Sequence, residues 1–214
     1  MNKKIIIPFS QPIYQVDDSS LITEEVIEFV KNITYIRFDP PNNNGSISED
    51  TYILNNPVLE DIKNHILNML KEYVVDIYGY SPNNLEPCFL NSWITKHNKD
   101  DYSQDHYHTN SIVSGTFYIQ VDEKSGALAF KKHFSGLFPH QLEPEIDTYT
   151  QHNSAEWRII PKNGTTVLFP SDFVHFTDKS KSDKDRYCLA FNIWFKGHFG
   201  YDHREPKIAL LDFN

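Results

Sequence analysis

Three histidines are spaced in a way that could hold a metal ion. His106 and His108 are separated by one residue, and His175 follows later in the chain. On an extended segment, residues two apart project to the same face, so His106 and His108 are expected to point the same way. Imidazole is a common metal ligand, and such a pair on a strand can chelate a metal. The pair predicts one side of a metal site.

His175 follows a turn at Gly164, a short apolar run and Pro170. If the strand that carries His175 lies across the fold from the strand that carries His106, the three imidazoles converge and leave coordination positions open. Open positions are typical of a catalytic metal site, because structural sites are closed by protein ligands.

Arg186 opens an apolar run, and ten residues separate it from His175. A charged side chain in such a run needs a partner, and a guanidinium can bind a carboxylate through two parallel hydrogen bonds. We therefore expect Arg186 to bind the far carboxylate of a dicarboxylic acid whose 2-oxo acid end chelates the metal.

The N-terminal part of the chain carries helical patterns. A short strand is expected at 4–9 and a helix at 21–33, with Thr23 as its N-cap. A longer helix is expected at 57–78, because Asn56 can cap it and apolar residues recur at helical spacing. These helices should pack an apolar stripe against the rest of the protein.

After residue 87 the chain consists of short runs rich in β-branched and aromatic residues, separated by turn residues. The runs predict strands at 88–95, 111–121, 127–130, 156–160, 165–169 and 186–195. Helices followed by many short strands favour a mainly β fold, namely a cupin-like jelly roll or double-stranded β-helix with N-terminal helices packed on one sheet. We expect one domain over 1–214, in which 1–85 supports a catalytic core at 86–214.

Composition narrows the partners and the cellular location. The 214 residues include 29 acidic and 20 basic side chains, which give a formal net charge of −9 and disfavour nucleic acid and anionic membranes as partners. Cys88 and Cys188 are expected to be buried and reduced. The first apolar run ends at Pro8, too early for a signal sequence or a spanning helix, so we expect a cytoplasmic protein.

The order of motifs between residues 88 and 196 resembles the 2-oxoglutarate- and iron(II)-dependent oxygenase superfamily, and more narrowly a group of oxygenases found in bacteria and their phages. The residues that carry the resemblance are Trp93, His106-x-His108, Asn110-Ser111, Ser114-Gly115, Tyr118, Gly164, Phe169-Pro170-Ser171, His175, Arg186 and Phe191-Asn192.

The resemblance implies a double-stranded β-helix that uses iron(II), dioxygen and 2-oxoglutarate, releases succinate and carbon dioxide, and usually hydroxylates a primary substrate. It makes His106, His108 and His175 the metal ligands and catalytic residues, and Arg186 the anchor of the far carboxylate of 2-oxoglutarate. It also implies that Tyr118 or Asn192 shares in holding this co-substrate.

The sequence departs from the superfamily at His108, where the superfamily usually has aspartate or glutamate. A third neutral imidazole leaves the site one negative charge poorer. Asp101 and Asp105 are the nearest carboxylates; we expect both to be solvated, and either would restore the usual ligand set if it faced the metal. Two alternatives stay open: a cupin-like three-histidine metalloenzyme that does not use 2-oxoglutarate, and a non-catalytic metal- or ligand-binding jelly roll.

The other histidines are expected to have no role in the site, since a lone histidine is more often a surface or packed residue. They are His65, which is expected in a helix, and His97, His133, His140, His152, His198 and His203, which are expected in polar loops or the tail. The primary substrate, a small molecule or a side chain, is expected to be selected by loops at 96–105 and 131–155.

Overall fold

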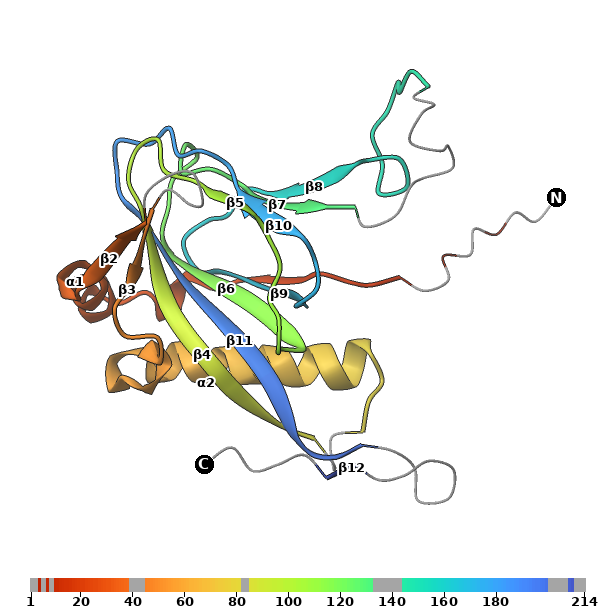
Figure 1. The fold of residues 1–214 in the computed structure, drawn as a ribbon, viewed down its shortest axis with the longest axis horizontal. Coiled ribbons are helices and arrows are strands. Elements are labelled where there is room, and N and C mark those ends of the chain that lie inside the picture. Colours follow the sequence, from red (N-terminus) through yellow and green to blue (C-terminus); the bar gives the residue numbers. More distant parts are fainter. Residues whose placement is uncertain are drawn as a thin grey trace.

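The strands form two antiparallel sheets in this computed structural model, which describes residues 4, 7, 10–38, 45–81, 85–132, 144–199 and 208–209. The large sheet has eight strands and the small sheet has four. Figure 1 shows the small sheet lying above one face of the large sheet and α2 running along the large sheet away from it. The expected mainly β fold with helices packed on one sheet is confirmed.

The large sheet combines strands from both ends of the chain. Its order is β1 (Tyr14–Asp17), β9 (Thr165–Pro170), β6 (Val113–Gln120), β11 (Arg186–Phe199), β4 (Leu85–His97), β3 (Gly45–Ser48) and β2 (Tyr35–Phe38), with β12 (Ile208–Ala209) also paired to β11. The small sheet has the order β5 (Ser103–His106), β10 (His175–Thr177), β7 (Leu128–Lys131) and β8 (Glu156–Ile159).

The helices begin where the sequence places their caps. Thr23 accepts a hydrogen bond from the Val26 amide at the start of α1 (Glu24–Asn32), and Asn56 accepts one from the Val58 amide. The helical stretch after Asn56 has three parts, a 3₁₀ turn η3 (Pro57–Leu59), α2 (Glu60–Lys71) and a π-helical segment η4 (Glu72–Ile77). Two further 3₁₀ turns are η1 (Ser19–Leu21) and η2 (Ile53–Asn55).

Two apolar clusters lie between three layers, which are the helices, the large sheet and the small sheet. The first fills the space between the helices and the outer face of the large sheet, and it includes Ile62, Ile66 and Leu70 of α2, each at most 1% exposed. The second lies between the two sheets, where Tyr118 and Phe169 of the large sheet meet Phe130 of the small sheet. Alternate positions of β11 therefore contribute to different clusters, as the period of a strand requires.

Some expectations are refined by the structure. The strand expected at 4–9 lies mostly outside the described residues, and the first strand is β1. Cys88 and Cys188 are both free thiols, as expected, but Cys88 is only half-buried while Cys188 is buried. Among the described residues, no helix has the length and apolar character needed to cross a membrane.

Candidate functional site

His106 and His175 are direct neighbours in the small sheet. His106 ends β5, His175 begins β10, and the two residues are paired in the antiparallel register. The expectation that their strands lie across the fold from each other was therefore wrong. Residues paired in this way project to the same face, so the sheet itself brings the two rings together.

His108 reaches the same place from outside the strand. It follows the end of β5, and its amide donates to the Ser171 carbonyl at 2.9 Å. Same-face alternation along one strand, the reason first given for the convergence of His106 and His108, is therefore not how the structure achieves it. Instead, the segment after β5 is fixed to the chain just before β10, and this contact aims the ring.

The three imidazoles converge on one point. Ring centroids are 4.2 Å apart for His106 and His175, 5.1 Å for His108 and His175, and 5.2 Å for His106 and His108. One ring nitrogen of each residue lies within 4.8 Å of the other two, a spacing that can hold a metal ion. The convergence of the three predicted residues is thus present in the structure.

Backbone carbonyls fix the tautomer of two of these rings. Nδ1 of His106 donates to the Gln104 carbonyl at 2.7 Å, and Nδ1 of His175 donates to the Phe173 carbonyl at 2.8 Å. Because a carbonyl can only accept, the proton is on Nδ1 and the lone pair is on Nε2 in both rings. Nε2 is then the atom available to a metal, in the arrangement common for ligating histidines.

Burial keeps His108 and His175 uncharged near neutral pH. Burial, together with the neighbouring His106, lowers the pKa of His108 to about 4 and the pKa of His175 to about 3. Since only the neutral ring can ligate a metal, both residues are ready for binding without first losing a proton.

No carboxylate among the described residues joins the three histidines. The expectation that Asp101 is solvated was wrong. Asp101 is 2% exposed, and its carboxylate accepts two hydrogen bonds from Arg37, at 2.6 and 2.7 Å. Asp105 is exposed and forms an ion pair with Lys131. Neither aspartate therefore replaces His108, and the candidate ligand set among the described residues consists of three histidines.

Arg186 lies on the inner face of the large sheet and is 2% exposed. Its Nη1 donates to Nδ1 of His97 at 3.2 Å, and its guanidinium carbon lies 5.1 Å from the centre of the Tyr118 ring. The Nε of Arg186 and the hydroxyl of Tyr118 are buried without hydrogen-bond partners among the described residues. Buried polar atoms in proteins are normally paired, so this unpaired set indicates a place where a polar ligand binds.

The two side chains described as contacting Arg186, His97 and Tyr118, are both neutral. Burial raises the pKa of Tyr118 far above its usual range, and burial together with the Arg186 charge lowers the pKa of His97 to about 3. The guanidinium is therefore the one charged group among the three, and no carboxylate contacts it in the described part of the chain. An anion could supply the missing negative charge.

Asn192 lies on the same face, further along β11, and its amide is occupied. Its Oδ1 accepts from the Ser114 hydroxyl at 2.7 Å, and its Nδ2 donates to Asn91 Oδ1 at 2.9 Å. The Ser114 hydroxyl also lies 2.8 Å from that of Ser171, the residue that holds the His108 amide. Asn192 thus belongs to a polar row that leads from the large sheet to the third histidine.

His97 is the residue that the sequence reasoning missed. It was expected in a polar loop, but it is the last residue of β4, is 2% exposed and pairs with Arg186 in the register. The alternation of Trp93, Thr95 and His97 along one strand could have indicated an inward-facing position. Turn residues immediately after His97 hide that signal.

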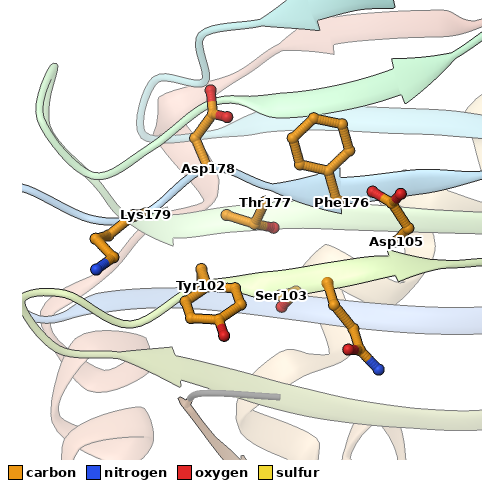
Figure 2. A pocket seen from close by; sticks show the side chains of 8 residues that line it. Tyr102, Ser103, Asp105, Phe176, Thr177, Asp178 and Lys179 are labelled. Atoms are coloured by element: carbon orange, nitrogen blue, oxygen red, sulfur yellow. The ribbon is translucent and has the colours of Figure 1, made fainter. Parts of the chain in front are cut away.

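The surface hollow in Figure 2 is separate from the three histidines. It is lined by residues 102–105 and 176–179, which include Asp105, Phe176 and Asp178, and by none of the three histidines. Asp105 and Phe176 are sequence neighbours of His106 and His175, so they point to the opposite face of the small sheet. The candidate site is on the inner face and the hollow is on the outer one.

Comparison with known proteins agrees with this geometry. Residues 91–192 match the family model described as "Putative 2OG-Fe(II) oxygenase", a range that contains all three histidines and Arg186. No curated protein matches the chain by sequence.

Several solved structures are similar over most of the chain. An oxidoreductase of the 2OG-Fe(II) oxygenase family from Burkholderia pseudomallei has 11% identity and a TM-score of 0.57, over 85% of this chain and 84% of that chain. A prolyl-4-hydroxylase from Pseudomonas putida has 11% identity and a TM-score of 0.55, over 87% and 92%. The epimerase SnoN, in complex with Fe3+, alpha ketoglutarate and nogalamycin RO, has 12% identity and a TM-score of 0.61, over 95% and 92%. At these identities the likeness shows the fold, and the expected double-stranded β-helix is confirmed.

Proposed function

Because this chain belongs to the 2-oxoglutarate- and iron(II)-dependent oxygenase superfamily, we propose that it oxidises an organic substrate with dioxygen and releases succinate and carbon dioxide. The observation that carries the proposal is the convergence of three imidazoles within 4.8 Å, opposite a sheet that buries an arginine without a carboxylate partner. Hydroxylation is the outcome that we propose for the substrate.

We propose His106, His108 and His175 as the metal ligands. The donor set fits iron(II), since imidazole nitrogen suits this metal and three protein ligands leave positions for small ligands. When bound, iron(II) supplies the redox centre at which dioxygen and 2-oxoglutarate react. The protein contributes by holding two Nε2 lone pairs in place through the carbonyls of Gln104 and Phe173.

We propose Arg186 and Tyr118 as the groups that hold the far carboxylate of 2-oxoglutarate. The unpaired Nε of Arg186 and hydroxyl of Tyr118 are both donors, and a carboxylate accepts from both. Since the amide of Asn192 already bonds Ser114 and Asn91, Tyr118 is the better supported second contact, and a direct role of Asn192 stays a prediction.

The third histidine favours one alternative, a three-histidine metalloenzyme that does not use 2-oxoglutarate. A ligand set without a carboxylate occurs in open metal sites of other chemistry. The buried Arg186 argues for the first proposal, because a buried cation without an anion is costly and an acidic co-substrate would remove that cost. Metal binding alone cannot separate the two functions, but 2-oxoglutarate binding can.

The remaining proposals concern the chain and its setting. We propose that residues 1–214 form one domain with its catalytic core in 86–214, supported by the pairing of β1 with β9 and of β3 with β4 in one sheet. Two free thiols support a reducing, cytoplasmic location. The net charge of −9 supports a substrate other than nucleic acid.

The test combines binding and turnover. Under anaerobic conditions, iron(II) with 2-oxoglutarate should produce a visible charge-transfer band that iron(II) alone does not, and the pair should raise the melting temperature more than the metal does. Admission of oxygen should then yield succinate. Stabilisation by metals without any response to 2-oxoglutarate would instead support the alternative enzyme, and no response to either would contradict both.

A further inference from the structure

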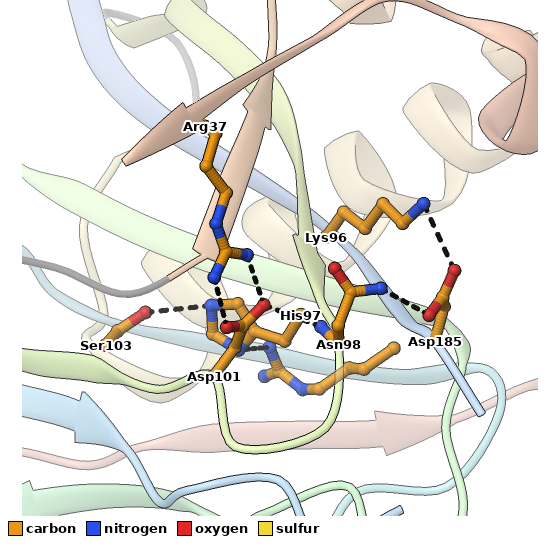
Figure 3. Close-up of polar contacts among 8 residues, drawn as sticks. Arg37, Lys96, His97, Asn98, Asp101, Ser103 and Asp185 are labelled. Atoms are coloured by element: carbon orange, nitrogen blue, oxygen red, sulfur yellow. Dashed lines mark hydrogen bonds and ion pairs between the residues drawn. The ribbon is translucent and has the colours of Figure 1, made fainter. Parts of the chain in front are cut away.

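His97 connects the two halves of the candidate site. It is paired with Arg186 across β4 and β11 in the large sheet, and its other ring nitrogen reaches Ser103 of the small sheet. Figure 3 shows His97 and Ser103 with the dashed contact between them. Arg186 is the proposed anchor of 2-oxoglutarate, and Ser103 lies on β5, which ends at His106.

The hydrogen bonds define the tautomer of His97. Nη1 of Arg186 donates to Nδ1 at 3.2 Å, so Nδ1 carries a lone pair. The proton is then on Nε2, which lies 3.3 Å from the hydroxyl oxygen of Ser103 and donates to it. A guanidinium has donors only, so the arrangement works only while His97 is neutral.

A bulge in β5 makes the contact with Ser103 possible. His175 pairs with His106 and Thr177 pairs with Ser103, so three steps along β5 face two steps along β10. In a regular strand, residues three apart would point to opposite faces. The extra residue lets Ser103 and His106 both face inward.

We propose that His97 is a positioning residue, which orients the Arg186 guanidinium toward the far carboxylate of 2-oxoglutarate and links this anchor to the strand of the metal ligand His106. The proposal rests on the proposed function. His97 does not contact the co-substrate; it acts through Arg186, whose Nη1 it occupies so that Nε is left for the ligand.

The surroundings of His97 leave its ring little freedom. A Cβ atom added at Gly45 of β3 would lie 2.5 Å from Cδ2 and 2.8 Å from Nε2 of the ring. On another side, Arg37 donates a hydrogen bond to the buried Asp101 (Figure 3). The Asp101 carboxylate also accepts from the Asn98 amide at 2.8 Å, and this contact fixes the turn after His97. Gly45→Ala should therefore displace the His97 ring without changing any residue of the proposed site.

The test compares two ligands on the full-length protein loaded with iron(II) under anaerobic conditions. One is 2-oxoglutarate, and the other is 2-oxopentanoate, which keeps the metal-chelating end and chain length but lacks the far carboxylate. His97→Leu should raise the dissociation constant of 2-oxoglutarate by about 10-fold or more, as expected for losing an orienting charge-assisted hydrogen bond. The dissociation constant of 2-oxopentanoate should stay unchanged.

Two further variants separate positioning from general damage. His97→Asn keeps an acceptor near the position of Nδ1 and should restore most of the 2-oxoglutarate affinity. Gly45→Ala should weaken 2-oxoglutarate selectively, as His97→Leu does, and it provides the result if His97→Leu does not fold. Melting temperatures of the metal-loaded variants report on folding independently of ligand binding.

The outcomes distinguish the inference from its premise. If the wild type binds iron(II) but not 2-oxoglutarate, the proposed function fails and the role of His97 fails with it. If the wild type binds 2-oxoglutarate and His97→Leu binds it equally well, only the role of His97 is overturned. Equal weakening of both ligands would also overturn it, because the loss would then not pass through the far carboxylate.

Discussion

The inner faces of the two sheets build their halves of the candidate site in different ways. On the small sheet, each of two histidines is oriented by a carbonyl two residues earlier in its own strand or turn, Gln104 for His106 and Phe173 for His175. On the large sheet, Arg186 is held by His97, which is distant in sequence, and by the face of Tyr118. Two of the three histidines are therefore oriented by local contacts, whereas His108 and the anchor half depend on tertiary ones.

The two halves also differ in how their polar groups are satisfied. Nδ1 of His106 and Nδ1 of His175 already have partners, and one ring nitrogen of each of the three histidines lies within 4.8 Å of the other two. Arg186 and Tyr118 instead retain buried donors without partners. Histidines whose N–H groups are already paired suit a metal ion, which needs only their lone pairs. Unpaired donors suit a carboxylate, whose oxygens accept hydrogen bonds. Variants on each side should consequently lose different ligands.

The largest effect is expected from His175→Ala. Removal of a ligand should weaken iron(II) binding by more than about 100-fold, because loss of an outer-shell partner alone typically costs about 10- to 100-fold. Binding of 2-oxoglutarate should fall with it, since its chelating end needs the metal. Metal titration of the purified variant checks this, with the exposed His152→Ala as control; unchanged metal affinity would remove His175 from the ligand set.

A smaller and more selective loss is expected from Arg186→Ala. The dissociation constant of 2-oxoglutarate should rise by about 100-fold, the magnitude expected from losing hydrogen bonds between two charged groups, while iron(II) affinity should be retained. Arg158→Ala, which removes an exposed arginine from the outer face of the small sheet, is the matched control. If Arg186→Ala lost metal and 2-oxoglutarate affinity together, the two halves would not be separable as described.

The third prediction concerns pH and the metal-free protein. The pKa of His97 is lowered to about 3 in the folded state, so at acidic pH the unfolded chain takes up the proton more readily. The contribution of neutral His97 to the free energy of unfolding is therefore complete above about pH 6.5 and decreases as the pH falls toward 3. At pH 5 the decrease is about 2 kcal/mol.

Urea unfolding at pH 7 and pH 5 measures this contribution. Other groups titrate in the same range, so the useful quantity is the loss of unfolding free energy between the two pH values, compared between the wild type and His97→Asn. The loss should be about 2 kcal/mol smaller in the variant. An identical loss in both proteins would mean that His97 is not held neutral in the folded protein, contrary to its role as an acceptor for Arg186.

Much of the fold could be predicted because its signals are local. The caps at Thr23 and Asn56, the helical spacing after residue 57 and the short β-rich runs each mark an element within a few residues of sequence. The division of the second helical stretch into 3₁₀, α and π parts could not be predicted. The buried Tyr73 lies in the π part and its hydroxyl donates to the Pro12 carbonyl, a contact with a remote segment.

The candidate site could be predicted in its residues but only partly in its construction. His106, His108, His175 and Arg186 were recognisable from spacing and chemistry. Their arrangement was not, because the direct pairing of β5 with β10 depends on sheet topology. Asp101 was expected to be solvated and His97 to lie in a polar loop, since the polar residues around them resemble an ordinary loop. Both are buried by contacts with strands far away in sequence.

By itself, the sequence determined which side chains could do chemistry, because residue type and short-range spacing set what a group can ligate or bind. The tertiary structure alone decided which of them meet and in what protonation state. Sheet pairing places His106 beside His175, and burial between β3, β5 and β11 keeps His97 neutral against Arg186. Register and desolvation depend on partners remote in the chain, and no local pattern encodes them.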